Sequence, residues 1–424
     1  MICLYGIMSS SEYTSDSELS TSSDEVDYQE NNLQLEGKIL REYNIITELG
    51  RGSYSIVWLG YNIKDKKYYA IKVQHSDDFK SGLDEAKFMK RLPKKVDVFN
   101  HIIDSFIYTI IEKSRRRRKR IKKKRYLCSV YNLHAGNLDG FLRKGKYKEG
   151  YGQDVVKKIS TQLLQGLAVL HEKVRVFHGD IKPDNIIIKG VNKRDDKLIK
   201  LYNKCNYEEL LKEELKGNKD KDKDNLIRKK IHNSIVENIQ KKIIEEDSIY
   251  NIDDKYIEDI KISISDFGDF CDDEDQFDEE FGTRYYRSPE GILMGECDYK
   301  VDIWAAGCTI YELLTGKILF DPEKDRIRDR DHYHLYYINC YCGKFSKRFL
   351  RFTEKWKKYF TKKGELKQFS VKSKSLFSTD FSDKEKISEF IANLLAINPK
   401  KRASANEALN STWLYSNCNL ESTS

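Results

Sequence analysis

The first part of the chain has the hydrophobic pattern of a small β-sheet. Residues 43–49 and 56–61 are rich in apolar and β-branched side chains, and they flank a short segment that contains two glycines. This pattern predicts two strands joined by a turn. Residues 69–73, 106–113 and 126–133 have the same aromatic and β-branched character, so three further strands are expected.

After these strands the hydrophobic spacing becomes that of helices. Apolar residues recur at intervals of three and four over residues 154–170, at Val156, Ile159, Leu163, Leu167 and Leu170. This spacing predicts a helix with one buried face. Residues 186–188 and 260–265 predict two short strands, and an apolar helix begins near Asp302. The later part of the chain is therefore expected to be mainly helical.

Two stretches lack a regular hydrophobic pattern. The chain from Ser9 to about Glu36 is mainly Ser, Thr, Asp and Glu, and residues 191–258 are mainly Lys, Asp, Glu and Asn. Such segments bury too little apolar surface to offset the entropy lost on ordering. We predict a disordered acidic, Ser-rich tail over residues 1–38. We also predict an unstructured, low-complexity insertion over residues 191–258, with helical pieces such as 233–245.

Charge is concentrated in two runs of opposite sign. Charged residues make up 34% of the chain, yet the formal net charge is only +8. Ten of the eleven residues from 115 to 125 are basic, and seven of the nine from 272 to 280 are acidic. Like charges repel, so the basic run predicts a solvated hairpin tip over residues 114–125. A nuclear-import signal, a nucleic-acid contact and a mimic of a basic substrate are alternatives for this run, although few aromatic residues accompany it.

Cysteine usage and hydropathy indicate an intracellular protein. Nine cysteines are scattered from Cys3 to Cys418, which implies no disulfide framework and favours a reducing compartment. Cys340 and Cys342 have no second pair at zinc-site spacing, which favours ordinary thiols. No apolar run is long enough to cross a bilayer, and the first residues lack the basic region of a signal peptide. We expect a cytoplasmic protein, with nuclear entry as an alternative that depends on the basic run.

The segment 178–185, with the sequence HGDIKPDN, has the residue types and spacing of a phosphoryl-transfer loop. In that chemistry an aspartate, here Asp180, orients the attacking hydroxyl. An amide five residues later, here Asn185, reaches a metal ion on the nucleotide phosphates. Lys182 can offset the charge that develops on the transferred phosphoryl group. A solvated polar loop does not explain these residue types at these offsets.

Other segments supply the partners that such a loop requires. Gly50 and Gly52 allow backbone N–H groups to approach phosphate oxygens, because glycine has no Cβ. Lys72 follows on the next predicted strand, where it can pair with nucleotide phosphates, and Glu85 on a short helix can reach it. Asp266 begins an Asp-Phe-Gly sequence and offers a second oxygen ligand for magnesium.

Together these motifs resemble those of the eukaryotic protein kinases, from about residue 39 to residue 414 apart from the insertion. The motifs are, in chain order, Gly50-x-Gly52, Lys72, Glu85, His178-x-Asp180-x-Lys182-x-x-Asn185, Asp266-Phe-Gly268, Ser288-Pro-Glu290, Asp302 and Arg402. The resemblance implies an α+β, bilobal protein-kinase fold. It places a small lobe of antiparallel β-sheet and one helix over 39–133, a larger, mainly α-helical lobe over 134–416 and a tail over 417–424. It also implies a monomeric Ser/Thr kinase that uses ATP and Mg2+ and acts on protein substrates.

The resemblance assigns roles to individual residues. It implies that the catalytic residues are Asp180, Lys182, Lys72, Glu85 and Thr283, and that Asn185 and Asp266 bind the metal. The residues implied in nucleotide binding are Leu49, Gly50, Gly52, Ser53, Ser55, Val57, Ala70, Lys72, Tyr131 and Leu133. It further implies that Thr283 contacts Asp180 and Lys182, that Asp302 anchors the catalytic loop, and that Glu290 pairs with Arg402.

Several stretches narrow the resemblance to the SR-protein kinases, which phosphorylate serines in arginine-serine repeats. These stretches are Arg284–Glu290, Asp331-His332, Gly343–Lys347, Phe360–Lys367 and Leu394–Ala403. The insertion also falls where that family carries a spacer. We therefore expect basic or arginine-flanked substrates, attracted by the acidic run after Gly268. Asp331 keeps one acidic position of that family's docking groove, whereas Lys317 stands where another acid is expected, so the sequence leaves processive phosphorylation of long repeats open.

Gly179 bears on regulation. It stands where many kinases have an arginine that pairs with an activation-segment phosphate, so we expect activity without activating phosphorylation. A catalytically weak or inactive kinase-like scaffold, binding partners through the tail and insertion, is the alternative function. A basic nucleic-acid-binding protein is a third hypothesis, and it does not account for the catalytic residues.

Overall fold

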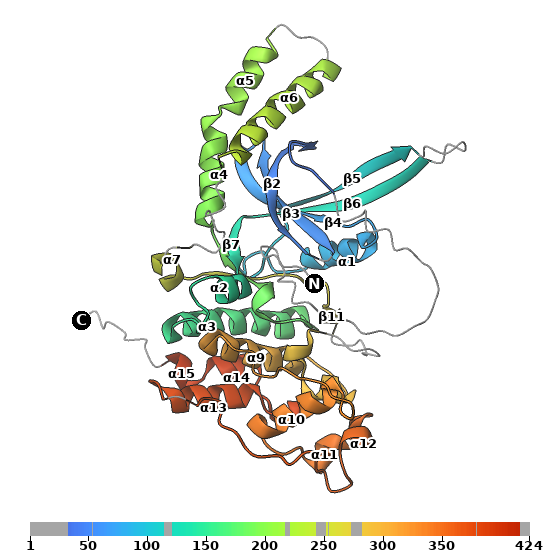
Figure 1. Cartoon of the computed structure of the whole chain (residues 1–424), viewed down its shortest axis with the longest axis vertical. Coiled ribbons are helices and arrows are strands. Elements are labelled where there is room, and N and C mark those ends of the chain that lie inside the picture. The colour runs from blue at the N-terminus through green and yellow to red at the C-terminus, as the bar shows by residue number, and fades with distance from the viewer. Residues whose placement is uncertain are drawn as a thin grey trace, which may run out of the picture. The chain divides into compact units, whose positions relative to one another are not determined.

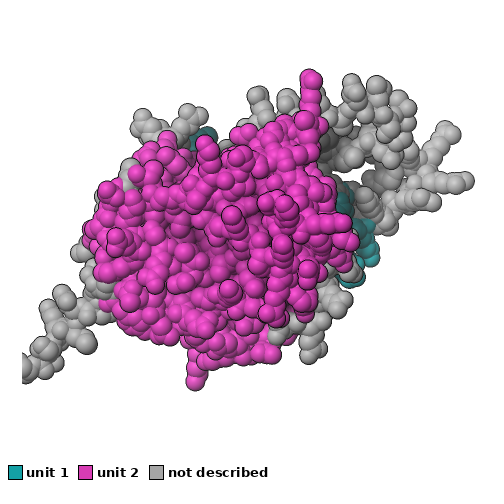
Figure 2. Space-filling view, turned by 90° about the horizontal axis from the view of Figure 1, so that it is seen from below, with its two compact units in different colours: residues 1–90, 101–137, 190–252 teal, residues 91–100, 138–189, 253–424 magenta. Residues whose placement is uncertain are grey.

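The computed structural model describes residues 33–52, 54–113, 121–216, 221–242, 252, 254–272, 282–378 and 380–415. The chain forms two compact units, which are coloured separately in Figure 2. Unit 1 comprises residues 1–90, 101–137 and 190–252, and unit 2 comprises residues 91–100, 138–189 and 253–424. The fold is α+β, as the resemblance implied, because unit 1 contains the large antiparallel sheet and unit 2 is mainly helical.

Unit 1 is built on a six-stranded antiparallel sheet with the strand order β1-β2-β3-β4-β6-β5 (Figure 1). Its strands are β1 (Ile39–Leu40), β2 (Tyr43–Arg51), β3 (Ser55–Asn62), β4 (Lys67–Gln74), β5 (Asp104–Lys113) and β6 (Ile121–Tyr131). Helix α1 (Phe79–Met89) lies against β6, and strand β7 (His134–Asn137) follows β6 in the chain. All five strands predicted in the first part of the chain are present.

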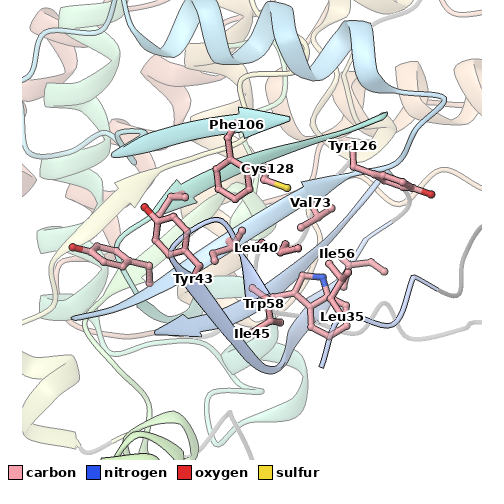
Figure 3. Packing of buried hydrophobic residues seen from close by; sticks show 13 residues of the cluster. Leu35, Leu40, Tyr43, Ile45, Ile56, Trp58, Val73, Phe106, Tyr126 and Cys128 are labelled. Carbon is pink, nitrogen blue, oxygen red and sulfur yellow. The ribbon is translucent and has the colours of Figure 1, made fainter. Parts of the chain in front are cut away.

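One face of this sheet carries the apolar core of unit 1. Side chains alternate between the two faces of a strand, so every second residue joins this core. Figure 3 shows its members from successive strands packed together, among them Tyr43, Ile45, Ile56, Trp58, Val73, Phe106 and Cys128. Leu35, which precedes β1, is completely buried in the same cluster. The predicted tail over 1–38 is therefore too long, because two leucines at its end pack on the sheet; residues 1–32 lie outside the described residues.

The insertion differs from its prediction. Composition predicted an unstructured segment within the large lobe with helical pieces such as 233–245, but the described part is mostly helical and residues 190–252 belong to unit 1. Its helices are α4 (Lys193–Lys204), α5 (Tyr207–Glu214) and α6 (Lys221–Gln240) in unit 1, and α7 (Asp254–Glu258) in unit 2. Sparse apolar residues recur at helical spacing and are buried, as in Ile235, Val236 and Ile239. The prediction from composition was wrong because a few apolar residues at helical spacing are enough to stabilise a helix when it can pack against a sheet.

Tyr202 and His232 attach the insertion to the sheet. Tyr202 on α4 accepts a hydrogen bond from Asn44 Nδ2 at 3.1 Å, and its hydroxyl donates to His232 Nδ1 on α6 at 3.1 Å. His232 Nε2 donates to the carbonyl oxygen of Ile45 at 2.8 Å. All four residues are buried, so the chain of hydrogen bonds is shielded from water.

Unit 2 is arranged around a helix that is apolar on all sides. That helix, α9 (Lys300–Thr315), is buried along most of its length, which is typical of a helix at the centre of a domain. The other helices are α2 (Leu138–Lys144), α3 (Gln153–Val169), α8 (Pro289–Leu293), α10 (Arg330–Cys342), α11 (Lys347–Leu350), α12 (Trp356–Tyr359), α13 (Lys384–Leu394), α14 (Ala405–Leu409) and α15 (Thr412–Tyr415). Its short strands are β8 (Val176–Phe177), β9 (Ile186–Lys189), β10 (Ile262–Ile264) and β11 (Cys271–Asp272), with β9 paired to β10 and β8 to β11.

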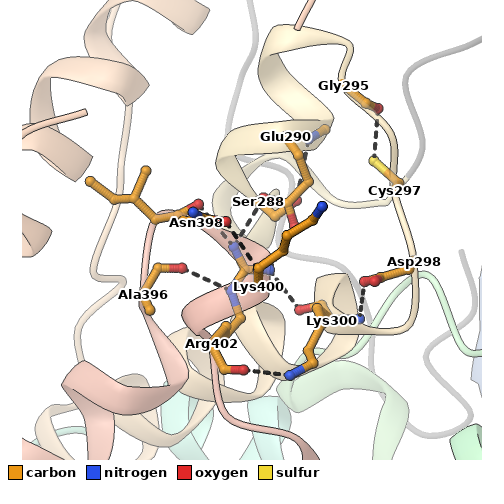
Figure 4. Close-up of polar contacts among 12 residues, drawn as sticks. Ser288, Glu290, Gly295, Cys297, Asp298, Lys300, Ala396, Asn398, Lys400 and Arg402 are labelled. Carbon is orange, nitrogen blue, oxygen red and sulfur yellow. Dashed lines mark hydrogen bonds and ion pairs between the residues drawn. The ribbon is translucent and has the colours of Figure 1, made fainter. Parts of the chain in front are cut away.

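A buried ion pair links two distant segments of unit 2. Arg402 forms two hydrogen bonds to the Glu290 carboxylate, at 2.6 and 2.9 Å, and both side chains are almost completely buried (Figure 4). The Arg402 guanidinium also lies over the Trp304 ring of α9, at 5.1 Å from its centroid. The predicted Glu290–Arg402 pair is confirmed, and the bidentate geometry explains why arginine rather than lysine suits this position.

Candidate active site

The residues of unit 1 predicted to bind nucleotide lie on or next to its strands, and the predicted catalytic residue Glu85 lies on α1. Lys72 Nζ on β4 is 2.8 and 3.0 Å from the two carboxylate oxygens of Glu85 on α1, and both side chains are buried. The pair fixes the ammonium group at the end of a long side chain. A lysine held in this way presents a positive charge without first losing side-chain entropy.

The glycine-containing segment connects β2 to β3. Gly50 still pairs with Val57 in the sheet, and Gly52 N–H donates to the carbonyl oxygen of Ser55 at 2.9 Å. Ser53 lies outside the described residues. The Ser55 hydroxyl is buried and has no hydrogen-bond partner. A buried polar atom without a partner is costly, so this hydroxyl is a candidate for contact with a bound ligand.

The remaining predicted nucleotide-binding residues are apolar positions on neighbouring strands. Leu49 and Val57 are buried on β2 and β3, and Ala70 on β4 pairs directly with Tyr131 on β6. Leu133, just after β6, is half-buried. These residues supply an apolar surface next to the glycine-containing segment, as an adenine ring requires.

The catalytic loop of unit 2 brings four predicted residues together. Lys182 Nζ is 2.6 Å from Asp180 Oδ2 and donates to Thr283 Oγ1 at 2.7 Å. Thr283 N–H donates to Asp180 Oδ1 at 2.9 Å, so both contacts expected of Thr283 are present. Asn185 Nδ2 donates to the carbonyl oxygen of Asp180 at 2.8 Å and to its Oδ2 at 3.1 Å.

These contacts keep Asp180 ionised. Burial acts to raise the pKa of Asp180, but the Lys182 ammonium and the hydrogen bonds from Thr283 outweigh it and leave the pKa below its usual value. A carboxylate that is charged and fixed from three sides can orient a hydroxyl group by accepting its hydrogen bond.

The two predicted metal ligands are neighbours in unit 2. Ser265, the residue before Asp266, donates from its backbone N–H and its hydroxyl to the carbonyl oxygen of Asn185, at 2.9 and 3.0 Å. The Asn185 Oδ1 atom is buried and has no hydrogen-bond partner. Asp266 has a left-handed backbone, with φ of 62°, which is uncommon for a residue other than glycine.

The electrostatics of this region also fit a cation. Burial and then the Asp180 and Asp266 carboxylates raise the pKa of Asp269, so negative charges crowd together here. No cluster of three or more His, Cys, Asp or Glu side chains suited to a metal occurs among the described residues. One carboxylate and one amide oxygen are the donors that magnesium takes when nucleotide phosphates and water supply the rest.

Asp302 on α9 anchors the catalytic loop through hydrogen bonds to its backbone. Its carboxylate accepts the backbone N–H groups of His178 and Gly179, at 2.8 and 2.9 Å, and lies 2.9 Å from His171 Nε2. The predicted anchoring role of Asp302 is confirmed. His178 in turn reaches the carbonyl oxygen of Ser265 at 3.0 Å, which ties the loop to the strand before Asp266.

The backbone conformation at residue 179 requires glycine. The sequence did not indicate this requirement. Its φ is +82°, and a Cβ at this position would lie 2.4 Å from the carbonyl oxygen of Asp269. Gly282, with φ of +70°, would likewise place a Cβ 2.6 Å from the Gly179 carbonyl oxygen. The segment after Asp266 and the segment before Thr283 therefore both pack directly on the catalytic loop, and only glycine permits these approaches.

A group of acidic residues beside the catalytic loop was not predicted. Arg143 on α2 donates to Asp139 and to Glu312, both at 2.6 Å, and the Tyr286 hydroxyl donates to Glu312 at 2.6 Å. We call Asp139, Asp184 and Glu312 the acidic cluster. No sequence motif indicates it, because its members come from three distant segments.

The carboxylates of the acidic cluster repel one another. Burial and the Asp184 carboxylate raise the pKa of Asp139 to about 6. Burial raises the pKa of Glu312 to about 7, even though the Tyr286 hydrogen bond and the charge of Arg143 act in the opposite direction. Burial and mutual repulsion thus favour the protonated forms of Asp139 and Glu312, and a nearby cation would favour their charged forms.

The chain matches the protein kinase domain family over residues 43–203 and 223–414. It belongs to the protein kinase family. The kinase is similar to a putative serine/threonine-protein kinase, L205, of Acanthamoeba polyphaga mimivirus, with 27% identity over 95% of this chain and 92% of that protein. It is also similar to the serine/threonine-protein kinase SRPK of Physarum polycephalum, with 26% identity over 88% of this chain and 85% of that protein.

A third relative is the protein kinase dsk1 of Schizosaccharomyces pombe, with 23% identity over 88% of this chain and 80% of that protein. These relatives confirm the resemblance to SR-protein kinases, and the chain is a protein serine/threonine kinase. Protein kinases in general use ATP and Mg2+ and act on protein substrates. Within the described residues, no helix is both long and apolar enough to span a membrane.

Proposed function

We propose that this kinase transfers the γ-phosphate of ATP to Ser or Thr residues flanked by arginine. The observation that carries the catalytic part is the arrangement of Asp180, Lys182, Thr283 and Asn185. Asp180 accepts the hydrogen bond of the substrate hydroxyl and orients its oxygen for attack. Lys182 offsets the charge that develops on the transferred group, and Thr283 holds the pair in place.

Asn185 and Asp266 hold Mg2+ in this proposal, the first through its unpaired Oδ1 atom. Mg2+ supplies positive charge that neutralises the nucleotide phosphates. Lys72, fixed by Glu85, pairs with phosphate oxygens, and the backbone around Gly50 and Gly52 covers them. The roles of all these residues rest on their chemistry and on their match to the family's motifs.

The acidic cluster supports the preference for arginine. Asp139 and Glu312 both accept hydrogen bonds from Arg143, and the Asp184 carboxylate of the catalytic loop acts to raise the pKa of each. A substrate arginine close to the phosphorylated residue would be attracted by the negative charge of this cluster, which acts at a distance for the fully buried Glu312. The acidic run over 272–280 adds to this attraction, although only Asp272 belongs to the described residues.

Docking of long basic tracts is not supported. Asp331, the acidic position kept from the SR-protein kinase groove, is paired with Arg284 at 2.5 Å and is mostly buried. The neighbouring Asp329 is paired with Lys358 at 2.6 Å. Because both carboxylates are paired within the chain, we propose that the kinase phosphorylates individual arginine-flanked sites and not long repeats in succession.

The packing around Gly179 supports activity without activating phosphorylation. The segments on both sides of residues 273–281 are held by the catalytic loop, through the β8–β11 pairing and through the Thr283 hydrogen bonds. Gly179 leaves no arginine at this position to receive a phosphate. We propose that these contacts replace the phosphate-dependent ones.

A peptide array tests the proposal. The phosphatase-treated full chain should phosphorylate arginine-flanked serine peptides faster than otherwise identical acid-flanked peptides, and the difference should shrink as salt rises. Asp180→Asn should abolish phosphorylation of all peptides while leaving the unfolding temperature unchanged within a few degrees. Equal rates on both peptide sets would refute the preference. Activity that appears only after phosphorylation of the activation segment would refute phosphate independence, and an inactive wild type would favour the scaffold hypothesis.

A further inference from the structure

The β5–β6 hairpin of unit 1 carries a high density of positive charge toward its tip. Eleven of the thirteen residues from 113 to 125 are basic, and none is acidic. In the described part of this run, Lys124 is half-exposed and lies on the same face of β6 as Tyr126, whereas the exposed Lys123 and Arg125 lie on the opposite face. Like charges at this density repel one another, so a negatively charged partner that covers them would be bound favourably.

The same hairpin extends the apolar face of the sheet. Tyr126, Tyr108 and Ile110 lie on the face that carries the core of unit 1, but Tyr108 and Ile110 are only partly buried. Ile110 pairs with Lys124, so basic and apolar side chains adjoin on this face. Figure 3 shows Tyr126 at the margin of the cluster, with its hydroxyl pointing away from the other labelled residues. The hairpin face therefore suits a segment that is both acidic and partly apolar.

Leu33, the first described residue, lies against this face of the sheet. Leu33 packs against the apolar core, and it lines a small cavity together with Ile56, Val73 and Tyr126. Tyr126 directly follows the basic run in the sequence. The chain segment that precedes Leu33 therefore starts close to Tyr126, at the end of the basic run.

The segment that precedes Leu33 is acidic. Residues 9–32 contain seven carboxylates and no basic residue, and residues 24–30 read DEVDYQE. In this heptad Val26 and Tyr28 alternate with polar residues, which suits an extended segment with one apolar edge. Its length is sufficient: nine extended residues span about 30 Å, whereas the five β6 residues before Tyr126 span about 17 Å.

We propose that the acidic segment over residues 24–30 docks in cis on the hairpin face formed by Tyr108, Ile110, Lys124 and Tyr126. The tail carboxylates neutralise the basic charge on this face, which includes Lys124, while Val26 and Tyr28 cover the partly exposed Tyr108 and Ile110. The tail then occupies the basic surface and limits its access to other polyanions. This docking is independent of the catalytic proposal, because it involves only unit 1.

Site-specific photo-crosslinking of the full chain tests the docking. A benzophenone amino acid in place of Tyr28 should crosslink to residues within 108–126, as mapped by mass spectrometry. The matched control carries the same photoprobe with Asp24→Asn, Glu25→Gln, Asp27→Asn and Glu30→Gln, which keeps the length and the apolar residues. Loss of about three ion pairs should lower the crosslink yield about fivefold. Crosslinks that map to other regions, or a yield unaffected by neutralising the tail, would overturn the proposal.

Charge reversal supplies the decisive comparison. Lys122→Glu and Lys124→Glu together should abolish the crosslink, whereas Lys123→Glu on the opposite face of β6 should leave it in place. Adding Asp24→Lys, Glu25→Lys, Asp27→Lys and Glu30→Lys to the double variant should restore the crosslink. Mixing isotope-labelled and unlabelled chains distinguishes cis from trans docking, since crosslinks between the two would contradict docking within one chain. Deleting residues 1–32 should raise the salt concentration needed to elute the protein from heparin, and an unchanged elution would also count against the proposal.

Discussion

His232 in the insertion donates a hydrogen bond from Nε2 to the carbonyl oxygen of Ile45 on β2, 187 positions earlier in the chain, at 2.8 Å. The same carbonyl oxygen also accepts the backbone N–H of Gly37 at 2.9 Å, so the His232 side chain adds a second hydrogen bond to a strand carbonyl. His232 is neutral in this arrangement, because Nδ1 accepts a hydrogen bond from Tyr202. The insertion is thus part of the small-lobe structure and not an appendage to it.

Removing the Tyr202 hydroxyl should destabilise the protein. Tyr202→Phe leaves an Asn44 amide hydrogen and His232 Nδ1 without partners in a buried site, which should cost about 2 kcal/mol of unfolding free energy. Urea unfolding followed by tryptophan fluorescence measures this loss. Tyr68→Phe is the matched control, because the Tyr68 hydroxyl bonds Asn203 at the surface and its loss should cost less than about 0.5 kcal/mol. Equal losses in the two variants would contradict the role of the buried network.

Stability should fall as the pH is lowered from about 6.5 towards 4. Burial lowers the pKa of His232 to about 4 in the folded protein, from 6.5 when unfolded. Between these values the unfolded state binds more protons, so the unfolding free energy decreases with decreasing pH and is unaffected by this group above 6.5. Unfolding measured at a series of pH values should show a shallower slope for His232→Gln than for wild type.

Gly179→Ala should impair both folding and catalysis. The added Cβ would need a positive φ and would lie 2.4 Å from the Asp269 carbonyl oxygen, so the catalytic loop must shift. We expect kcat to fall at least about tenfold, with a loss of about 1–3 kcal/mol in stability. Gly152→Ala is a suitable control because an added Cβ there meets nothing within 4 Å. Wild-type kcat in Gly179→Ala would show that the close packing is not needed for activity.

Asn185→Ala should weaken the response to magnesium. The substitution removes the unpaired Oδ1 atom proposed as a metal ligand, together with the hydrogen bonds to Asp180. The Mg2+ concentration that gives half-maximal activity should rise about tenfold or more. Ser265→Ala, which leaves Asn185 Oδ1 in place, should shift it much less. A fall in kcat with an unchanged magnesium requirement would assign Asn185 a positioning role only.

Selectivity for arginine should increase with pH across neutrality. The pKa values of Asp139 and Glu312 are raised to about 6 and about 7, so both carboxylates gain negative charge between pH 6 and 8. The ratio of kcat/KM for an arginine-flanked peptide to that for a neutral-flanked peptide should therefore rise several-fold over this range. In Glu312→Gln the ratio should be lower and nearly independent of pH above 6.5. A pH-independent ratio in the wild type would exclude the acidic cluster from recognition.

Much of the candidate site could be predicted because its residues lie close together in the sequence. Asp180, Lys182 and Asn185 fall within one loop, and the strand before Lys72 and the helix that carries Glu85 have clear local patterns. The order of strands and helices followed from hydrophobic periodicity in the same way. Local spacing is enough here, because secondary structure and loop chemistry depend mainly on neighbouring residues.

The sequence alone therefore determined the family and the α+β fold, and it predicted the candidate catalytic residues. Only the tertiary structure decided that the insertion is helical. Tyr202 and His232 stabilise it through hydrogen bonds to each other and to a strand far away in the sequence. It also decided why residue 179 is glycine, which depends on the approach of Asp269, and where the acidic cluster lies. In each case a long-range contact, which no local pattern encodes, supplies the free energy or the steric limit that gives the residue its role.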